Sequence, residues 1–323
     1  NDLIKIQLKE TNQEKEIKKT INTLKNVTNE VSQKVKKQYE ENPYPRWRYT
    51  YPNIKTHFTN RFENQIRPNL IKYSRIDKFN NPNVLIAGCG TGRHLFIVNN
   101  YLNANILGID LSLSSLAYAK RKIDEAGIKN IEFLQADILD LKKLKKKFDI
   151  IECIGVLHHM KEPTNGLKIL IDLLEPHGVL KLGLYSRVAR KHVYEVRNFI
   201  KKNNFKNDIY DIRKCREKIL SFNKDEFFRK ISSRNDFYST STVRDLIFHE
   251  QEHSFTISEI SQILKKFKLE FLGFSDSFIK NKYSKIYSSD KKNVNLDNWD
   301  KYENSNPNTF IGMYNFWVKK NED

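Results

Sequence analysis

The sequence predicts a doubly wound α/β fold, in which a mostly parallel sheet carries helices on both faces. From residue 84 onward, short apolar runs of strand length alternate with amphipathic stretches of helical length. The first run, residues 84–87, breaks into the turn Gly88-x-Gly90-x-Gly92 before a helical stretch begins. The chain ends in a strand, a long polar loop and a last strand, which indicates a terminal antiparallel pair.

This pattern divides the chain into four segments. Residues 1–82 are expected to form an N-terminal helical extension, and residues 83–186 a Rossmann-like core with five parallel strands. Residues 187–255 interrupt the alternation as a helical insertion, and residues 256–323 return to the sheet. We therefore expect seven strands in one domain with additions, with the terminal strand antiparallel.

Composition favours a soluble protein of the reducing cytoplasm. The three cysteines, an odd number without Cys-x-x-Cys spacing, indicate neither a disulfide framework nor a zinc knuckle. No apolar run approaches the roughly 20 residues of a membrane span, and the N-terminus lacks the pattern of a signal peptide. Because the first residue is Asn1 and not Met, we expect a trimmed or partial version of a longer chain.

The formal net charge of +18, from 57 basic and 39 acidic residues, raises the possibility of a nucleic-acid or other anionic partner. Lys outnumbers Arg and Asn is abundant, however, as codon bias of an AT-rich genome would produce. Nucleic acid is therefore possible but not favoured as a partner. Residues 187–234 alone carry 15 basic and 6 acidic side chains, a net charge of +9.

The N-terminal segment combines a helical stripe with a rigid aromatic stretch. Apolar residues recur from Ile17 to Val35 at helical spacing, which indicates one amphipathic helix or a pair of short ones. In the stretch Tyr39–Trp47, two prolines flank Tyr44 and end the helix. Its Tyr39, Tyr44, Arg46 and Trp47 either cover a ligand or pack on the edge of the domain.

Later elements follow from the same patterns. We expect a short helix near Asn69–Tyr73, a turn at Asn81-Pro82, and a helix after the capping box formed by Thr256 and Glu259. The expected strands, in chain order, are 84–88, 105–111, 131–137, 148–155, 179–185, 269–274 and 309–318.

The glycine turn and two acids predict a nucleoside cofactor. Asp110 ends the second strand at the same sheet edge as the turn, where its carboxylate can accept hydrogen bonds from a ribose. NAD and S-adenosylmethionine both fit that pair. The Gly-x-Gly-x-Gly spacing, the terminal strand pair, and Asp137, which closes strand three where it can accept from an adenine amino group, favour S-adenosylmethionine.

With these motifs the chain resembles the class I S-adenosylmethionine-dependent methyltransferases, by motif over residues 84–186 and by order of elements over 256–319. The resemblance implies that the glycine loop (Gly88, Cys89, Gly90 and Gly92) holds the amino-acid part of the cofactor. It also implies that Asp110, with Leu111, binds the ribose hydroxyls, and that Asp137, with Ile138, contacts adenine.

The chain is most similar to the bacterial methyltransferase modules often found behind tetratricopeptide repeats. The likeness lies in Tyr39–Trp47, in residues 155–160, in residues 183–186, which include Tyr185, and in Asp236–His253. No such repeats are present in this sequence. The related modules accompany repeats that bind peptides, so the resemblance favours a peptide or protein side chain as acceptor.

Two histidines are candidates for catalysis. His158 and His159 directly follow strand four at the ligand-binding edge, where a neutral imidazole can deprotonate or orient an acceptor. Alternatively, one of them only hydrogen-bonds the loop backbone. Strand four lacks Asp/Asn-Pro-Pro-Tyr and Pro-Cys sequences, which argues against methylation of nucleobase amino groups and of cytosine C5.

The end of the insertion, Asp236–His253, is dense in polar groups. We expect a polar wall of the substrate pocket there; a capped surface helix is the alternative. The stretch from His249 also fits a His-x-x-Glu-His zinc pattern, but no third ligand is clearly placed, so no metal is expected. The expected wall residues are Tyr238, Arg244, His249, Glu252 and His253.

Together these features predict an S-adenosylmethionine-dependent methyltransferase with S-adenosylhomocysteine as its product. A small metabolite or an RNA are alternative acceptors, and no membrane partner is expected. The sequence also leaves open two functions of other classes: a non-catalytic S-adenosylmethionine-binding module and a NAD-dependent oxidoreductase.

Overall fold

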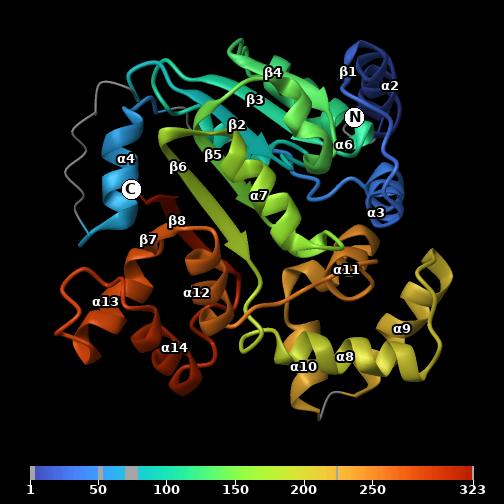
Figure 1. Ribbon diagram of the computed structural model, residues 1–323. Coiled ribbons are helices and arrows are strands. Elements are labelled where there is room, and N and C mark those ends of the chain that lie inside the picture. The colour runs from blue at the N-terminus through green and yellow to red at the C-terminus, as the bar shows by residue number, and fades with distance from the viewer. Residues whose placement is uncertain (1–3, 50–53, 70–78, 223–224, 322–323) are drawn as a thin grey trace.

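The computed structural model describes residues 4–49, 54–69, 79–222 and 225–321. They form one eight-stranded sheet with the order β1-β4-β3-β2-β5-β6-β8-β7 (Figure 1). The pairs from β1 to β6 are parallel, whereas β8 runs antiparallel to both of its neighbours. The doubly wound fold with a terminal antiparallel strand is therefore confirmed.

The core alternates strands and helices from Asn83 to Leu184. Two of its helices, α6 and η3, begin at a side-chain cap; at the start of α6 the Ser112 hydroxyl accepts a hydrogen bond from the Ser115 amide, 3.0 Å away. The core elements, in chain order, are β2 (Asn83–Ala87), α5 (Arg93–Val98), β3 (Asn105–Asp110), α6 (Leu113–Glu125), β4 (Ile131–Gln135), η3 (Ile138–Leu144), β5 (Phe148–Ile154), η4 (Leu157–His159), α7 (Pro163–Leu173) and β6 (Leu174–Leu184).

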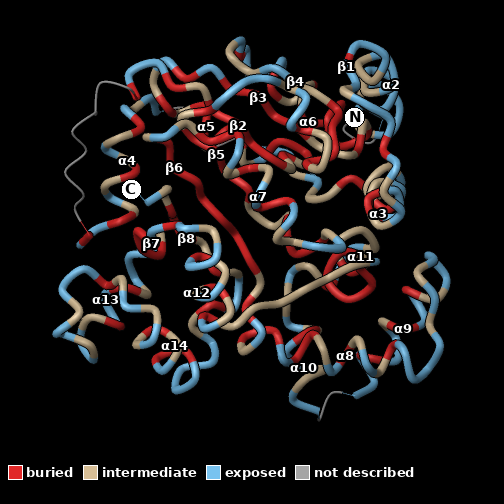
Figure 2. The backbone as a smooth tube through the Cα atoms, in the orientation of Figure 1, coloured by how far each residue is buried: buried red, intermediate tan, exposed pale blue. Residues whose placement is uncertain are grey.

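Apolar side chains are buried on both faces of the sheet. One cluster joins the strands to η3, α7 and the C-terminal helices, and the other joins them to α5, α6 and α4 (Phe58–Ile66). Figure 2 shows the strands buried and the outer sides of the helices exposed. The same two-faced burial explains why the core strands read as continuous apolar runs.

The N-terminal segment wraps the edge of the core. It consists of η1 (Lys5–Glu10), α2 (Thr11–Thr20), β1 (Asn22–Thr23) and α3 (Glu30–Glu41). The expected stripe is thus a pair of helices, with a two-residue strand between them that the sequence did not predict. Arg121 of α6, whose side chain is 4% exposed, pairs with Glu10 and Glu14 and so fixes this segment to the core. The helix expected at Asn69–Tyr73 lies almost wholly outside the described residues.

The insertion is a small helical unit with its own apolar cluster. Its two ends meet where Ser186 and Phe255 form an isolated parallel bridge. In Figure 1 it lies at the lower right, beside the carboxyl ends of the core strands. Its elements are α8 (Lys191–Lys202), α9 (Ile209–Ser221), α10 (Glu226–Ser232), η5 (Asn235–Phe237) and α11 (Thr240–Ile247).

The C-terminal part contains two helices where a polar loop was expected, so that prediction was wrong. It comprises α12 (Ile257–Lys266), β7 (Leu269–Phe274), α13 (Ser277–Ile286), α14 (Leu296–Ser305) and β8 (Tyr314–Lys320). The buried residues of α13 are Lys280 and Tyr283, and the Lys280 ammonium donates to the carbonyl oxygen of Gln65 at 2.6 Å. Ile279 and Tyr283, with Tyr287 at its end, pack against the apolar core cluster and stabilise this helix.

All seven expected strands are found, with small differences in their bounds. The largest differences are that β6 begins at Leu174 and not at 179, and that β8 begins at Tyr314 and not at 309. The capping box at Thr256 and Glu259 is present. Within the described residues no helix is long and apolar enough to cross a bilayer.

The tight packing of the glycine turn against α6 gives a first prediction. Gly92 has a φ of +84°, and a Cβ atom there would lie 2.7 Å from the Ala119 Cβ. Gly127 has a φ of +68° with open space around it. Alanine costs about 1 kcal/mol of backbone energy at either site, but only Gly92→Ala adds overpacking of about 1–3 kcal/mol. Urea unfolding should show this extra loss relative to the control Gly127→Ala, and equal losses would contradict the packing argument.

Candidate active site

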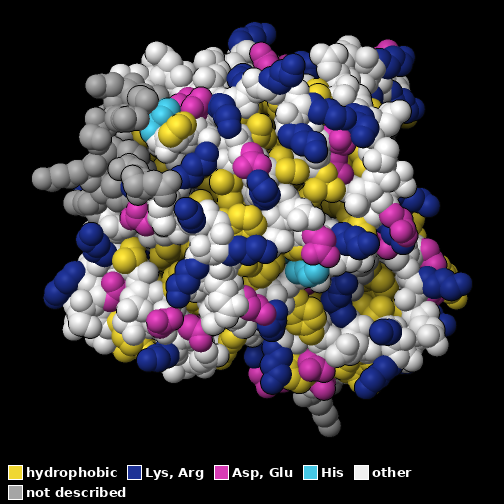
Figure 3. Space-filling view, viewed as in Figure 1, with side chains coloured by type: hydrophobic (Ala, Val, Ile, Leu, Met, Phe, Trp, Pro, Cys, Tyr) yellow, Lys and Arg dark blue, Asp and Glu magenta, His cyan; other side chains and the backbone are white. Residues whose placement is uncertain are grey.

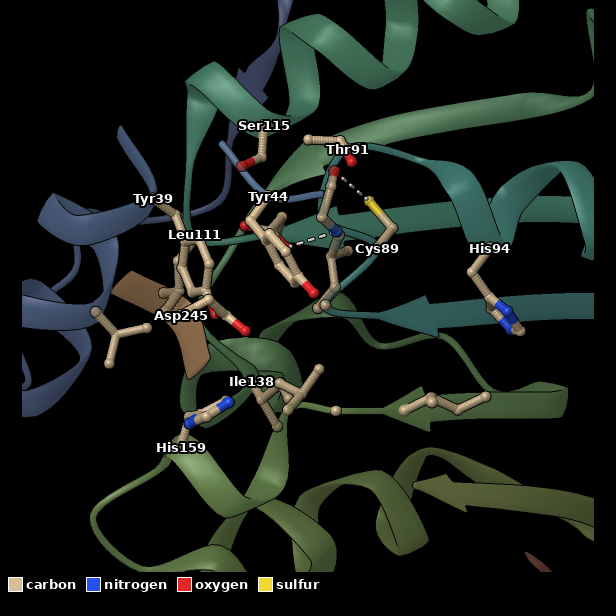
Figure 4. A pocket seen from close by; sticks show the side chains of 18 of the residues that line it. Tyr39, Tyr44, Cys89, Thr91, His94, Leu111, Ser115, Ile138, His159 and Asp245 are labelled. Carbon is tan, nitrogen blue, oxygen red and sulfur yellow. Dashed lines mark hydrogen bonds between the residues drawn. The ribbon is translucent and has the colours of Figure 1, made fainter. Parts of the chain in front are cut away.

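A cavity of about 530 Å³ opens at the carboxyl ends of β2, β3, β4 and β5 (Figure 4). The glycine turn and the strand ends line one side of it, and residues from α3 and α11 line the other. This is the edge at which a doubly wound sheet binds ligands. The volume lies within the range of sites for cofactors and small ligands, roughly 300–1,000 Å³.

The backbone of the glycine turn is held against β3. The amides of Gly88 and Cys89 both donate to the Ile109 carbonyl, at 2.9 and 2.8 Å. Gly88 has a φ of +78°, and a Cβ atom there would lie 2.3 Å from a methyl carbon of Val156. Glycine is therefore required at this position, both by its left-handed backbone and by the neighbouring side chain.

Asp110 is oriented toward the cavity by the backbone around it. One of its carboxylate oxygens accepts from the Gly90 amide at 2.8 Å, and the other accepts from the Ser112 amide at 2.9 Å. Burial raises the pKa of Asp110 to about 6, although these hydrogen bonds oppose the shift. Because the group lines the cavity and each oxygen retains acceptor capacity, the carboxylate can bind a pair of hydroxyl groups.

The next strand end supplies a second acid and an apolar slot. One oxygen of Asp137 accepts from the Leu139 amide at 3.0 Å, and the residue lines the cavity together with Leu111 and Ile138. The apolar side chains suit the faces of a purine, and the carboxylate suits its amino group. The glycine turn, Asp110 and Asp137 therefore lie together along the cavity and can offer hydrogen-bonding groups to a nucleoside cofactor such as S-adenosylmethionine.

The last turn of α3, Gln38–Glu41, joins the core to the insertion above the cavity, and we call it the α3 clasp. On the core side, Glu40 accepts hydrogen bonds from the amides of Leu113 and Ser114 at the start of α6. On the insertion side, Glu41 pairs with Arg244 at 2.8 Å, and the Tyr39 hydroxyl donates to Asp245 at 2.6 Å. Three consecutive residues, Tyr39, Glu40 and Glu41, therefore connect segments far apart in sequence.

A directed hydrogen-bond chain ends on Asp245. The Gln251 amide donates to His249 Nδ1 at 3.2 Å, so His249 Nε2 carries the proton and donates to the Tyr39 hydroxyl, also at 3.2 Å. Tyr39 in turn donates to Asp245. Burial raises the pKa of the Asp245 carboxyl to about 7, although the hydrogen bond from Tyr39 lowers it.

Three tyrosines and a histidine share this end of the cavity with Asp245, as Figure 4 shows for Tyr39, Tyr44 and His159. Burial raises the pKa of Tyr39, Tyr44 and Tyr185, so all three are neutral phenols. Burial lowers the pKa of His159 to about 3. Its Nδ1 lies 2.7 Å from the Gln251 carbonyl, and it is therefore a neutral imidazole protonated on Nδ1.

The structure brings many of the predicted site residues into this cavity. Among them His159, and not His158, has a ring that lines it. The predicted residues that line the cavity are Gly88, Cys89, Gly90, Asp110, Leu111, Asp137, Ile138, His159, Tyr39, Tyr44 and Tyr185.

Other predicted residues lie outside the lining and support it. Gly92 caps α5, His158 is fully buried with its ring stacked 3.8 Å from that of Tyr185, and His249 stacks on His159 at 3.6 Å. The Trp47 indole donates to the Thr91 carbonyl at 3.1 Å, so it supports the glycine turn from outside the cavity lining. Arg46 lies 5.9 Å from the Tyr118 ring centroid.

The expected polar wall is only partly present. Tyr238 is 64% exposed outside the cavity, and Arg244 acts through the α3 clasp. The His253 amide donates to the His158 carbonyl at 2.7 Å, and Glu252 pairs with Arg190 in an ion pair whose side chains are 1% and 3% exposed. No group suited to hold a metal occurs among the described residues.

Asp245 is the functional candidate that sequence reasoning missed. It lies inside the stretch expected to form the wall, but the sequence does not distinguish it from the other acidic residues there. No local spacing marks it, because α11 ends at Ile247 and His249, four residues after Asp245, lies beyond the helix. Only the approach of Tyr39 from α3 distinguishes Asp245 from a surface acid.

Comparison with known proteins assigns the core and most of the insertion to a protein family. A family model described as methyltransferase domain matches residues 78–267. The protein syc1184_c of Synechococcus sp. is 26% identical over 275 residues, which cover 76% of this chain and 60% of that protein. A ubiquinone biosynthesis O-methyltransferase of Actinobacillus pleuropneumoniae is 30% identical over 118 residues, 34% of this chain and 48% of the relative.

Among solved structures, PKMT2 from Rickettsia typhi in complex with AdoHcy is similar in fold. Its TM-score is 0.59 at 20% identity, over 84% of this chain and 55% of that one. At this identity the likeness shows the fold alone. The chain spans about half to three-fifths of the length of the relatives it matches.

The position of Asp110 predicts how the cofactor binds. Asp110→Ala should weaken binding of S-adenosylhomocysteine by about 1–3 kcal/mol, because charged hydrogen-bond acceptors are lost. In the unmutated protein, affinity should fall as the pH drops through about 6, where the carboxylate gains a proton. Isothermal titration calorimetry measures both, with Asp140→Ala outside the cavity lining as control. Unchanged affinity in Asp110→Ala, or tight binding of NAD instead, would refute the assignment.

Proposed function

The chain belongs to the methyltransferase domain family, and on that premise we propose that it transfers the methyl group of S-adenosylmethionine to the amino group of a lysine side chain in a polypeptide. The observation that carries the proposal is Asp245, a buried carboxylate that faces the cavity among three tyrosine rings. The expected class I S-adenosylmethionine-dependent fold is confirmed by the family match. The acceptor is inferred from the chemistry of the cavity.

A primary ammonium group matches this end of the cavity. The faces of Tyr39 and Tyr44 can attract a cation through their ring quadrupoles, and the Asp245 carboxylate can pair with it directly. The Tyr185 ring already contacts His158 and Arg190 with its two faces, so it borders this space with its edge. A lysine side chain also has an apolar stem that suits a narrow passage. A phosphate or a carboxylate entering the same space would instead be repelled by Asp245.

Asp245 is also the best-placed base. A lysine ammonium must lose a proton to give the neutral amine whose nitrogen can attack the methyl group, and a base with a pKa near 7 removes protons effectively at neutral pH. Asp245 has a pKa of about 7, whereas His159, with a pKa of about 3, is too weak a base to take up a second proton at neutral pH. We therefore assign the proton transfer to Asp245, and we assign His159 to shaping the pocket.

The cofactor supplies an already activated, electrophilic methyl group, so the protein's task is alignment and proton removal. The α3 clasp and α11, joined to each other, close the cavity on the side opposite the strand ends, which keeps water away from the reacting end. Tyr39 fixes one oxygen of Asp245 and leaves the other for the amine. A polypeptide can deliver a lysine into such a pocket while its backbone stays outside.

The other acceptors and classes are less well supported. The family match argues against a NAD-dependent oxidoreductase. A buried base beside the cofactor cavity is of no use to a module that only stores the cofactor. An RNA phosphate would not pair with Asp245, and a small amine would use the same pocket without needing a surface outside it.

The role of Asp245 can be tested by an isosteric substitution. Asp245→Asn should lower kcat by about 100-fold or more, because a general base typically contributes 10²–10⁴-fold. The affinity for S-adenosylhomocysteine should stay within about threefold, since Asp110 and Asp137 are unchanged. In the unmutated enzyme kcat/KM should rise with pH up to about 7, where the Asp245 carboxyl loses its proton. This rise should be absent in Asp245→Asn.

Asp297→Asn, the same substitution on the exposed side of α14, is the matched control. A kcat for Asp245→Asn equal to that of the control would exclude Asp245 as the base.

The acceptor itself is tested with isotopically labelled S-adenosylmethionine and a bacterial extract, followed by mass spectrometry of proteins, RNA and small molecules. The proposal predicts label on lysine amino groups of proteins. Label confined to RNA or to small molecules would overturn it.

A further inference from the structure

We propose that the arginine side chains on the outer face of the insertion bind acidic residues of the polypeptide whose lysine is methylated. This inference rests on the proposed function and adds a recognition site outside the cavity. It concerns Arg213, Arg216 and Arg234, which we call the arginine track, together with the exposed rings of Tyr210 and Tyr238. No motif of the cofactor core includes any of these residues.

The arginine track begins at the mouth of the cavity. Tyr44 lines the cavity, and its hydroxyl lies 3.5 Å from a carboxylate oxygen of Asp236 in η5. Arg234 lies next to Asp236, at 3.7 Å. Asp236 therefore connects Tyr44, in the cavity lining, with Arg234, the first residue of the arginine track.

From Arg234 the arginine track continues along η5 to α9. The Arg216 guanidinium lies 5.5 Å from the Phe237 ring centroid and donates to the Tyr238 carbonyl at 3.4 Å. Arg213 lies three residues earlier on α9, on the neighbouring part of the same helix face. Tyr210, another three residues earlier, is 73% exposed.

The terminal nitrogens of these guanidinium groups have donors to spare. An arginine carries five N–H donors. Nε of both Arg216 and Arg234 is buried and out of a peptide's reach, so only their terminal nitrogens can bind an outside carboxylate. The 3.7 Å pair of Arg234 with Asp236 is long for a charge-assisted bond. Arg213 is exposed and has no ion pair within the described part of the chain.

Charge complementarity identifies the occupant. Residues 187–234 carry a net charge of +9, and Figure 3 shows Lys and Arg side chains over the face of the insertion turned to the viewer. Arginine forks match carboxylates in a bidentate manner, and exposed tyrosines give a peptide backbone apolar support. RNA would also be attracted by these cations. Because the acceptor proposed above is a polypeptide, the occupant we propose is the segment around its lysine, and RNA is an outcome of the test below.

The proposal is tested by measuring the binding of two fluorescent peptides. In both, a central norleucine replaces the target lysine, so that no methyl transfer occurs during the measurement, and the peptides differ only in the residues around it. One peptide has glutamates on both sides and the other has glutamines. At low salt the acidic peptide should bind about tenfold more tightly, as expected for several exposed ion pairs acting together. The preference should weaken as salt increases.

Two variants locate the site. Arg213→Glu, at an exposed position where folding is not at risk, and Arg234→Gln should each reduce the preference for the acidic peptide at least about threefold. Lys285→Glu, an equal charge reversal on the exposed side of α13, should leave it unchanged. Equal binding of the two peptides would overturn the proposal, and so would an equal loss of the preference in Lys285→Glu. It would also be overturned if single-stranded RNA displaced the fluorescent peptide at a lower concentration than the unlabelled acidic peptide does.

The lysine forms of the same peptides separate this inference from the proposed function. If lysine is methylated equally in both peptides, the arginine track has no recognition role but the methyltransferase assignment stands. If neither is methylated while the acidic norleucine peptide shows its binding preference and its sensitivity to Arg213→Glu, the acceptor assignment fails and the binding site stands.

Discussion

The hydrogen bond from the Tyr39 hydroxyl to Asp245 is the contact on which the active cavity depends. It joins a residue of the N-terminal extension to one of the insertion, more than 200 positions later, directly above the ends of the core strands. Its neighbours in the α3 clasp extend the link, because Glu40 binds the start of α6 and Glu41 pairs with Arg244. Without this junction the glycine turn and Asp110 would bind a cofactor on an open sheet edge.

Local sequence patterns predicted the core well. The glycine turn, the acids at strand ends and the alternation of apolar runs each reflect a local backbone or burial requirement, so a single stretch of sequence reveals them. Asp245 and the role of Trp47 were not visible because they depend on contacts between distant segments. The helices α13 and α14 were missed because many Ser, Asn, Asp and Lys residues surround their short apolar stripes, which are made mostly of aromatic residues such as Tyr283, Trp299 and Tyr302.

Electrostatics acts on two scales in this molecule. Inside the cavity, burial and a few directed hydrogen bonds set the proton affinity of single groups, so Asp110 and Asp245 have raised pKa values while His159 is held neutral. Outside, exposed cations of the insertion act together and over a longer range. An acidic polypeptide would be drawn to the outer surface, and its lysine would then pair with the buried acid.

The central claim is that one cavity holds the cofactor at Asp110 and Asp137 and the acceptor amine at Asp245. A crystal structure of the protein with S-adenosylhomocysteine and a lysine peptide tests it most directly. The account predicts the ribose hydroxyls on Asp110 and the lysine nitrogen within hydrogen-bonding distance of Asp245, among Tyr39, Tyr44 and Tyr185. An acceptor amine that enters by another route and makes no contact with Asp245 would contradict it.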